Sequence, residues 1–128
     1  MSSIKKLDHS KLIIEKELSI YLKNLYFEPK LARIHVILRD EINLFIRYNN
    51  HDEYAYSVFF SKVELDRCRF DNYDDRWNIS TKPHHFHPRH NKIGVSSPMN
   101  GNPENDIPLI CKLIKSGELL SADLRFTK

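Results

Sequence analysis

The sequence predicts an α+β fold: an antiparallel sheet of four to five strands, with an N-terminal helix and a short C-terminal helix packed on it. Near the N-terminus, apolar residues recur every three or four positions, which is the period of a helix. In residues 33–39 and 42–48 they alternate with other residues, which is the period of a strand. The turns between these segments are short and polar, and they favour antiparallel neighbours because parallel strands need long crossovers.

The first predicted element is a helix over residues 8–26. Asp8 or Ser10 can cap its start, and Pro29 stops anything that runs on. One face of this helix is apolar, and we expect it to cover the sheet with Ile14, Leu18, Leu22 and Leu25.

Four strands are predicted next, over residues 33–39, 42–48, 54–60 and 63–70. The third is apolar at nearly every position, so we expect it near the centre of the sheet. After them, residues 81–90 are expected to be extended, because two prolines exclude a helix there. Residues 93–97 are a candidate short strand.

The loop and the helix that complete the chain are also predicted from composition. Residues 71–80 are polar and turn-rich, and we expect Trp77 to form a lid over the core. Asp106 is predicted to cap a helix over residues 107–116, which Gly117 ends.

Size and composition define one domain, which we place at residues 1–128. The chain is 41% apolar and 29% charged, as globular proteins are. Cys68 and Cys111 stand in no short metal-ligand spacing, so we expect two reduced core thiols. No apolar run is long enough for a signal peptide or a membrane span. These features predict a cytoplasmic protein without membrane contact.

The charge of the chain is unevenly distributed. The formal charge of +3 is mild and permits contact with nucleic acid without arguing for it. Between Arg76 and Lys92, however, there are four cations, four histidines and no acid. This basic strip lies on a nearly neutral body, so we expect the chemistry of the protein between Arg67 and Arg89.

Histidines and arginines are arranged there in a pattern that suits proton transfer and anion binding. On an extended segment His85 and His87 point to one face, and His84 points to the other. Two imidazoles on one face can exchange protons near neutral pH, bind a metal or hold a phosphate. Arg67 and Arg69 also share one face of their strand, which suits a bidentate contact with an oxyanion.

These residues leave three interpretations open. Imidazoles and guanidiniums can converge on a phosphate. A metal site needs a third ligand, Asp71 or another histidine, and no Cys or Glu ligand stands at a recognisable spacing. Alternatively the histidines only cap loops or stack on Trp77, while Asp71 and Asn72 form a turn. The residues favour the phosphate site, and we predict neither a metal nor a cofactor.

At these residues the sequence resembles the TumE family, small toxins encoded beside a helix-turn-helix antitoxin. The resemblance is carried by Arg69-Phe-Asp-Asn72 at the end of a strand and by Pro83-His-His-x-His87 about ten residues later. A weaker similarity extends over residues 31–116. Family members often carry histidines directly after the Asp-Asn pair, where this chain has Tyr73-Asp-Asp-Arg76, so the role of those histidines is unfilled or is taken by Arg76.

The resemblance implies a toxin that is neutralised by a cognate antitoxin with a helix-turn-helix domain and that acts on RNA. The hypothesis is a metal-independent endoribonuclease. His85 or His87 takes the proton of the ribose 2′-hydroxyl, and a second histidine protonates the leaving 5′-oxygen. Arg69, together with Arg67 or Arg89, stabilises the transition state. Asp71 orients a histidine. The alternative is a non-enzymatic module that binds protein or nucleic acid and has a structural or metal-binding histidine cluster.

The hypothesis assigns a role to each candidate residue. The catalytic candidates are Arg69, Asp71, His84, His85 and His87, and the substrate-binding candidates are Arg67, Asn72, Arg76 and Arg89. We expect Arg69, Asp71, His85 and His87 to lie around one surface depression, on a sheet that takes at least four strands from residues 33–70.

Overall fold

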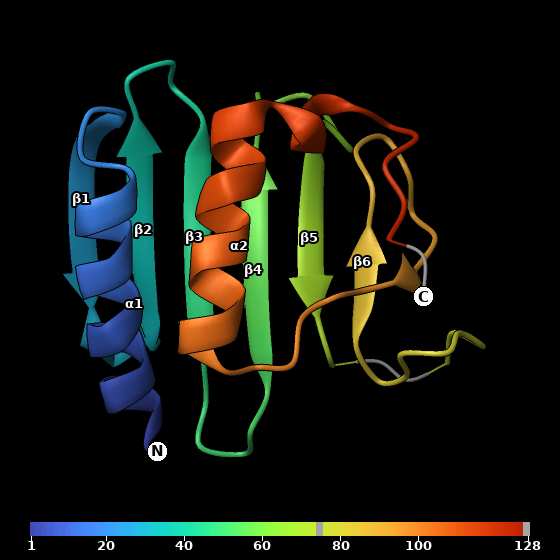
Figure 1. Ribbon diagram of the computed structural model, residues 1–128, viewed down its shortest axis with the longest axis horizontal. Helices are drawn as coiled ribbons and strands as arrows, with labels where there is room; N and C mark the ends of the chain where they lie inside the picture. Colours follow the sequence, from blue (N-terminus) through green and yellow to red (C-terminus); the bar gives the residue numbers. More distant parts are fainter. Residues whose placement is uncertain (74–75, 127–128) are drawn as a thin grey trace.

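The computed structural model describes residues 1–73 and 76–126. Within these residues, seven strands form one antiparallel sheet in the order of the chain, and each is hydrogen-bonded to the next. Two helices cover one face of the sheet and leave the opposite face open (Figure 1). The elements are α1 (Ser3–Glu17), β1 (Leu22–Glu28), β2 (Arg33–Leu38), β3 (Asn43–Tyr48), β4 (Tyr54–Phe59), β5 (Arg67–Asp71), β6 (His85–His87), β7 (Val95–Ser96) and α2 (Pro103–Ser116), with 3₁₀ turns at Pro29–Leu31 and Glu118–Leu120.

The α+β class and the antiparallel sheet are as predicted, but the predicted strand number of four to five is wrong. The largest error concerns residues 22–26, which were expected to continue the N-terminal helix and instead belong to β1. A β-bulge between Leu22 and Asn24 explains the misleading spacing. Because the bulge adds one residue, Leu22 and Leu25 both pair with core-facing residues of β2 although they stand three apart.

α1 begins and ends earlier than the sequence suggested. Ser2 is its N-cap, and the Ser2 hydroxyl accepts a hydrogen bond from the Lys5 backbone N–H at 3.3 Å. The predicted cap Ser10 lies inside the helix, where its hydroxyl donates to the Lys6 carbonyl. The fully buried residues Leu7, Ile14 and Leu18 fix this helix on the sheet.

α2 also begins earlier than predicted, because its cap is Asn102 and not Asp106. Asp106 is fully buried inside the helix. Its carboxylate accepts hydrogen bonds from the Tyr56 hydroxyl at 2.6 Å and from the backbone N–H groups of Asn100 and Gly101 at 3.1 and 2.8 Å. Asp106 therefore joins α2 to β4 and to the preceding loop. The predicted end of this helix is confirmed at Gly117, whose φ of 77° is favourable for glycine.

Replacing Asp106 by alanine should destabilise the fold strongly. The buried Tyr56 hydroxyl and two partly buried backbone N–H groups would lose their acceptor, and an unsatisfied buried donor costs about 1–3 kcal/mol. We expect the free energy of unfolding to fall by about 3 kcal/mol or more, measured by urea denaturation. Glu104→Ala is the control, because the Glu104 side chain is 67% exposed. Equal stability of both variants would show that this network does not hold α2 in place.

The core lies between the helices and one face of the sheet. Alternate residues of β4, β5 and β6 point into it, among them Val58, Cys68, Phe70 and Phe86, which are at most 1% exposed. Cys68 and Cys111 are both buried and unpaired, as expected, and burial raises the pKa of each thiol to about 12.

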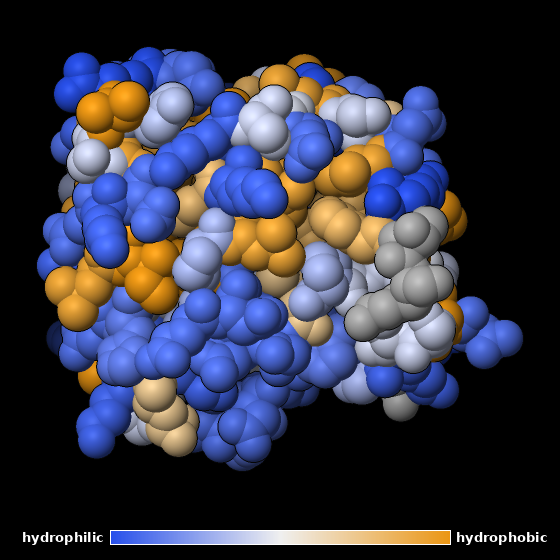
Figure 2. Space-filling view, viewed as in Figure 1, coloured by the Kyte–Doolittle hydropathy of each residue, from blue (hydrophilic) through white to orange (hydrophobic). Residues whose placement is uncertain are grey.

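The surface of the helix side is mixed in character. Apolar side chains reach it beside α2, with polar side chains around them (Figure 2). No helix in the described part of the chain has the length and apolar character needed to cross a membrane.

Candidate functional site

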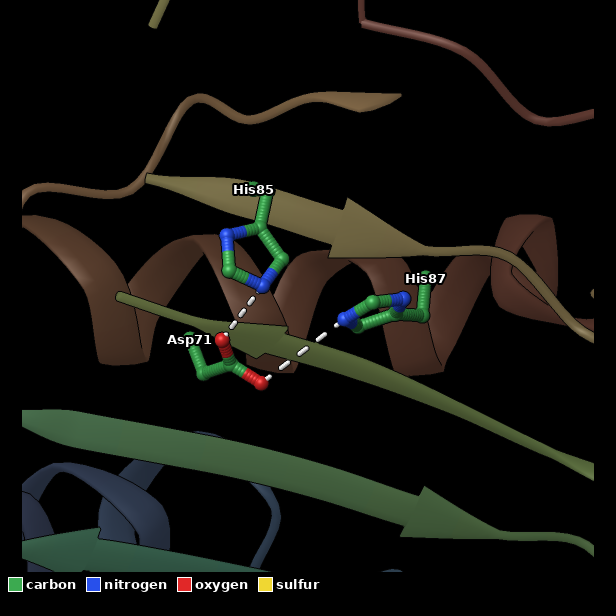
Figure 3. Close-up of side chains that lie close together, drawn as sticks. All are labelled: Asp71, His85 and His87. Atoms are coloured by element: carbon green, nitrogen blue, oxygen red, sulfur yellow. Dashed lines mark ion pairs between the residues drawn. The ribbon is translucent and has the colours of Figure 1, made fainter. Parts of the chain in front are cut away.

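The candidate site lies on the open face of the sheet, where β5 and β6 run side by side. Arg69 pairs with His87, and Asp71 pairs with His85. Because side chains alternate along a strand, these four residues point away from the core that their neighbours fill. Figure 3 shows both imidazoles directed at the two oxygens of the Asp71 carboxylate. The structure thus brings together the four residues that were expected to share a face.

Asp71 and His85 form a tightly fixed buried pair, with exposed fractions of 3% and 1%. The distance from His85 Nε2 to Asp71 Oδ1 is 2.6 Å, and His85 Nδ1 lies 2.9 Å from the Pro83 carbonyl oxygen. A carbonyl oxygen only accepts, so Nδ1 carries a proton. On the other side of the ring, Nε2 faces the Asp71 carboxylate as an ion pair. Neither nitrogen of His85 is therefore free for a substrate.

His87 differs because one of its nitrogens is free. Nδ1 donates to the Ile93 carbonyl oxygen at 3.0 Å, which leaves the lone pair on Nε2. Nε2 lies 3.9 Å from Asp71 Oδ2, too far for a hydrogen bond. Burial lowers the pKa of His87 below its usual value, and the nearby Asp71 carboxylate only partly opposes this. At neutral pH His87 is thus an uncharged imidazole that can accept a proton.

Arg69 supplies the positive charge of the site. Its Nε lies 2.5 Å from Asp71 Oδ2, and the contact is an ion pair without hydrogen-bond geometry, because this N–H has no acceptor among the described residues. The Arg69 side chain is 37% exposed, so it can still reach an anion from solvent. Its guanidinium carbon lies 5.4 Å from the centre of the Tyr73 ring.

Trp77 lies beside the two histidines, and not over the core as predicted. Its ring centre is 6.0 Å from that of His87 and 6.4 Å from that of His85. A Cβ at Gly94 would stand 2.7 Å from the Trp77 ring, so this packing needs glycine at that position. The open face offers the indole an imidazole surface to pack on, whereas the core is already filled by the two helices.

Three of the predicted site residues are engaged elsewhere. His84 Nδ1 is 2.9 Å from the Tyr54 hydroxyl and the two rings stack, which places His84 on the helix side of the sheet. Asn72 accepts from the Tyr54 backbone N–H and donates to the Asp52 carbonyl, so it joins two turns. Arg89 forms an ion pair with Asp66 at 2.6 Å. The structure does not bring these residues to the Asp71 cluster.

The other two predicted residues lie nearer. Arg67 is on the same strand and face as Arg69, and its Nη1 donates to the Asn91 carbonyl oxygen at 3.0 Å. The Arg76 guanidinium carbon lies 4.7 Å from the centre of the Trp77 ring. Their role in substrate binding stays a prediction.

Asp71, His85 and His87 are also residues of the kinds that bind transition metals, and their nearest ligand atoms all lie within 4.8 Å of one another. Metal–ligand bonds of about 2.1 Å in tetrahedral geometry hold donor atoms roughly 3.4 Å apart. The 2.6 Å contact between Asp71 and His85 is shorter and has the length of a hydrogen bond. Arg69 already supplies a cation to the same carboxylate. The arrangement is a cluster of ion pairs, and a metal would require its members to move apart.

The fold and the site together define a small α+β protein with an Arg-Asp-His-His cluster on the open face of a meandering sheet. The model of the TumE toxin family matches residues 8–116, which include both motifs and both site strands. The chain belongs to the TumE family, and it is accordingly a toxin of a toxin–antitoxin system with a cognate antitoxin. Neither a curated protein nor a solved structure matches it.

Proposed function

We propose that this toxin is a metal-independent endoribonuclease in which His87 is the general base. The observation that carries the proposal is the free Nε2 of an uncharged His87, held across the strand pair from an accessible arginine. The Ile93 carbonyl fixes Nδ1 of this ring, and Nε2 stands 3.9 Å from the Asp71 carboxylate that also binds Arg69. Cleavage of RNA needs both a base for the 2′-hydroxyl and a cation for the phosphate.

In the proposed reaction His87 Nε2 takes the proton of the ribose 2′-hydroxyl. The 2′-oxygen attacks the adjacent phosphorus, the bond from phosphorus to the 5′-oxygen breaks, and a 2′,3′-cyclic phosphate forms. The Arg69 guanidinium stabilises the added negative charge on the phosphate oxygens. Asp71 and His85 act as positioning residues, because His85 fixes the Asp71 carboxylate and the Asp71–Arg69 ion pair holds the guanidinium in place.

The leaving 5′-oxygen needs a proton, and we assign its donor to Tyr73. His85 has no free nitrogen, and His84 faces the other side of the sheet. Tyr73 is 42% exposed and lies beside Arg69, and burial of its ring raises the pKa of its hydroxyl so that it keeps its proton at neutral pH.

Tyr73→Phe should therefore slow the cleavage of ordinary RNA by about 10²-fold or more. Cleavage of an RNA with sulfur in place of the leaving 5′-oxygen should not change, because a thiolate leaves without a proton. Rates are compared in single turnover, with Tyr21→Phe as the control, because Tyr21 is 38% exposed and lies on the helix side of the sheet. An equal loss on both substrates would exclude Tyr73 as the donor.

Metal independence is tested on protein purified without a tag. We expect less than stoichiometric transition metal by elemental analysis, and RNA cleavage and growth arrest that persist after treatment with a chelator. The physical reason is that the Arg69 guanidinium already supplies a positive charge to the Asp71 carboxylate, where a metal would otherwise supply it. A stoichiometric metal whose removal stops cleavage and whose binding is lost in His87→Ala would replace this proposal with a metal site.

The partner and the place of action follow the family. We propose that the cognate antitoxin carries a helix-turn-helix domain and that the toxin acts in the cytoplasm. The membership in the TumE family supports an antitoxin in general. Sequencing of the adjacent reading frame and co-purification of its product test the domain type. A partner without such a domain would contradict it.

The alternative function is a binding module in which the cluster is only structural. The observation that favours it is the buried ion pair of Asp71 and His85, in which both nitrogens of His85 face a partner. In that case His87→Ala would remain fully toxic, and purified protein would bind its target without cleaving it.

A further inference from the structure

A row of aromatic and polar side chains crosses the open face of the sheet and ends at the candidate site. Each residue of the row pairs with the next across neighbouring strands, in the order Tyr26, His35, Phe45, Ser57, Arg69 and His87. No helix of the described chain covers this face (Figure 1). A sheet face that carries uncovered aromatic residues is typical of a binding surface.

The aromatic residues of this face stand next to one another and reach solvent. His35 stacks on Phe45 with ring centres 4.3 Å apart, and Phe45 meets the edge of Phe59 at 5.7 Å. Phe59 is 39% exposed and Tyr26 is 47% exposed. A partly exposed phenylalanine on a strand offers a flat apolar surface to a ligand.

Beside these rings lies a groove of about 920 Å³, between β3, the end of β4 and the loop over residues 61–65. Phe45 and Phe59 form its apolar wall, and Asn43 and Arg67 supply polar groups. Its volume falls within the range of sites for small organic ligands, roughly 300–1,000 Å³. An apolar wall with a few polar groups suits a heterocyclic base and an attached phosphate.

Arg67 connects the groove to the site. It lines the groove and stands two residues before Arg69 on the same face of β5, so their Cα atoms are about 7 Å apart. The two acids of this sheet face are already paired with arginines, Asp71 with Arg69 and Glu28 with Arg33. No acid forms an ion pair with Arg67 within residues 1–73 and 76–126, so its charge is available to an anion.

The other charged side chains of the groove do not neutralise the positive charge of Arg67. Glu41 is held by Lys23 at 2.7 Å, and Lys62 and Glu64 have opposite formal charges. The groove is therefore apolar on its wall and positive at the end that faces the catalytic cluster.

We propose that this groove is a subsite for one unstacked nucleotide of single-stranded RNA, adjacent to the phosphate that is cleaved. The base packs against Phe45 and Phe59, and Arg67 binds the phosphate that links this nucleotide to the next one. A base in a duplex is stacked and paired and cannot enter such a groove, so the substrate is single-stranded there. The inference rests on the proposed function, because it names the substrate of the same site.

The test measures the binding of a fluorescent single-stranded RNA to the full chain carrying His87→Ala, which removes cleavage but not the groove. Adding Phe59→Ala should weaken binding about 5- to 150-fold, since stacking of a base on an aromatic ring has that strength. Adding Arg67→Gln should weaken binding and reduce the slope of log Kd against log salt by about 0.7, the value for one single-strand phosphate.

Tyr21→Ala is the matched control. Tyr21 is an aromatic residue with almost the exposure of Phe59, 38%, and it lines a different groove, on the helix side. We expect it to leave the RNA affinity unchanged, and circular dichroism verifies that every variant is folded. An RNA with a single abasic position should lose affinity for the parent chain, while the same abasic change should have no further effect on Phe59→Ala.

The outcomes separate this inference from the proposed function. If the wild-type chain cleaves RNA but Phe59→Ala and Arg67→Gln bind it as tightly as the parent, the subsite is wrong and the proposed function stands. If RNA binds with the expected dependence on Phe59 and Arg67 but the wild-type chain never cleaves it, the subsite stands and the catalytic proposal fails. Loss of antitoxin binding without loss of RNA binding in Phe59→Ala would make the groove a protein interface and overturn the subsite.

Discussion

Replacing His87 by alanine is expected to abolish RNA cleavage and growth arrest while the protein stays folded. The imidazole is the base of the proposed reaction, and general acid–base catalysis by one group contributes about 10²–10⁴-fold in rate. Cleavage rates are measured at saturating RNA, where a loss in kcat without a rise in Kd indicates a chemical role. The variant removes the hydrogen bond to the Ile93 carbonyl and the ring contact with Trp77, so thermal melts verify that the protein stays folded.

The controls for this prediction are Lys5→Ala and His51→Ala, which alter exposed residues outside the site and should keep full activity. The pH dependence gives a second check. Burial lowers the pKa of His87, so the base stays uncharged at neutral pH and the rate falls only as the pH drops below about 6.5. A His87→Ala variant that remains fully toxic, together with His85→Ala, would refute the histidine mechanism.

The second large effect is expected for Arg69→Lys. A lysine keeps the charge, but its ammonium group cannot reproduce the planar fork that an arginine presents to a phosphate. We expect a loss of about 10²–10³-fold in kcat, comparable to the removal of one transition-state donor. Single-turnover cleavage of labelled RNA measures it.

Arg33→Lys is the matched control for Arg69→Lys. Arg33 also lies on the open face and forms an ion pair with a strand carboxylate, Glu28, at 2.8 Å. It is three strands away from β5, and the control variant should cleave normally. Similar losses in both variants would indicate a general effect of the basic face, and an unchanged rate in Arg69→Lys would remove the arginine from the mechanism.

The central strands were predictable because their apolar residues recur with the two-residue period that a sheet with one buried face requires. In β2 and β3 every second side chain is buried, as the sequence predicted. β1 was not predictable by the same means, because its bulge imposes a spacing of three on residues that face one core. The start of α2 was not predicted because aspartate is a common N-cap residue. In the structure the Asp106 carboxylate instead accepts hydrogen bonds in a buried network.

The pairing of the site residues was predictable from strand periodicity, since His85 and His87 must share a face when the chain is extended. It was not predictable which ring nitrogen of each histidine would be free. The Pro83 and Ile93 carbonyls decide which nitrogen of each ring is free, and a sequence does not reveal backbone acceptors that stand two and six residues away. The position of Trp77 was predicted wrongly, and Tyr73 was not considered as a site residue. In both cases the composition of a loop does not show which face of the sheet the loop crosses.

The 3′ ends of the RNA products test the central claim most directly. Purified toxin is incubated with a short RNA in the presence of a chelator, and the fragments are weighed by mass spectrometry. The proposed mechanism predicts 2′,3′-cyclic phosphate ends, 5′-hydroxyl ends, and complete resistance of an RNA with a single 2′-deoxynucleotide at the cleaved position. Fragments with 3′-hydroxyl and 5′-phosphate ends, or RNA that remains intact while cells are still arrested by the toxin, would contradict it.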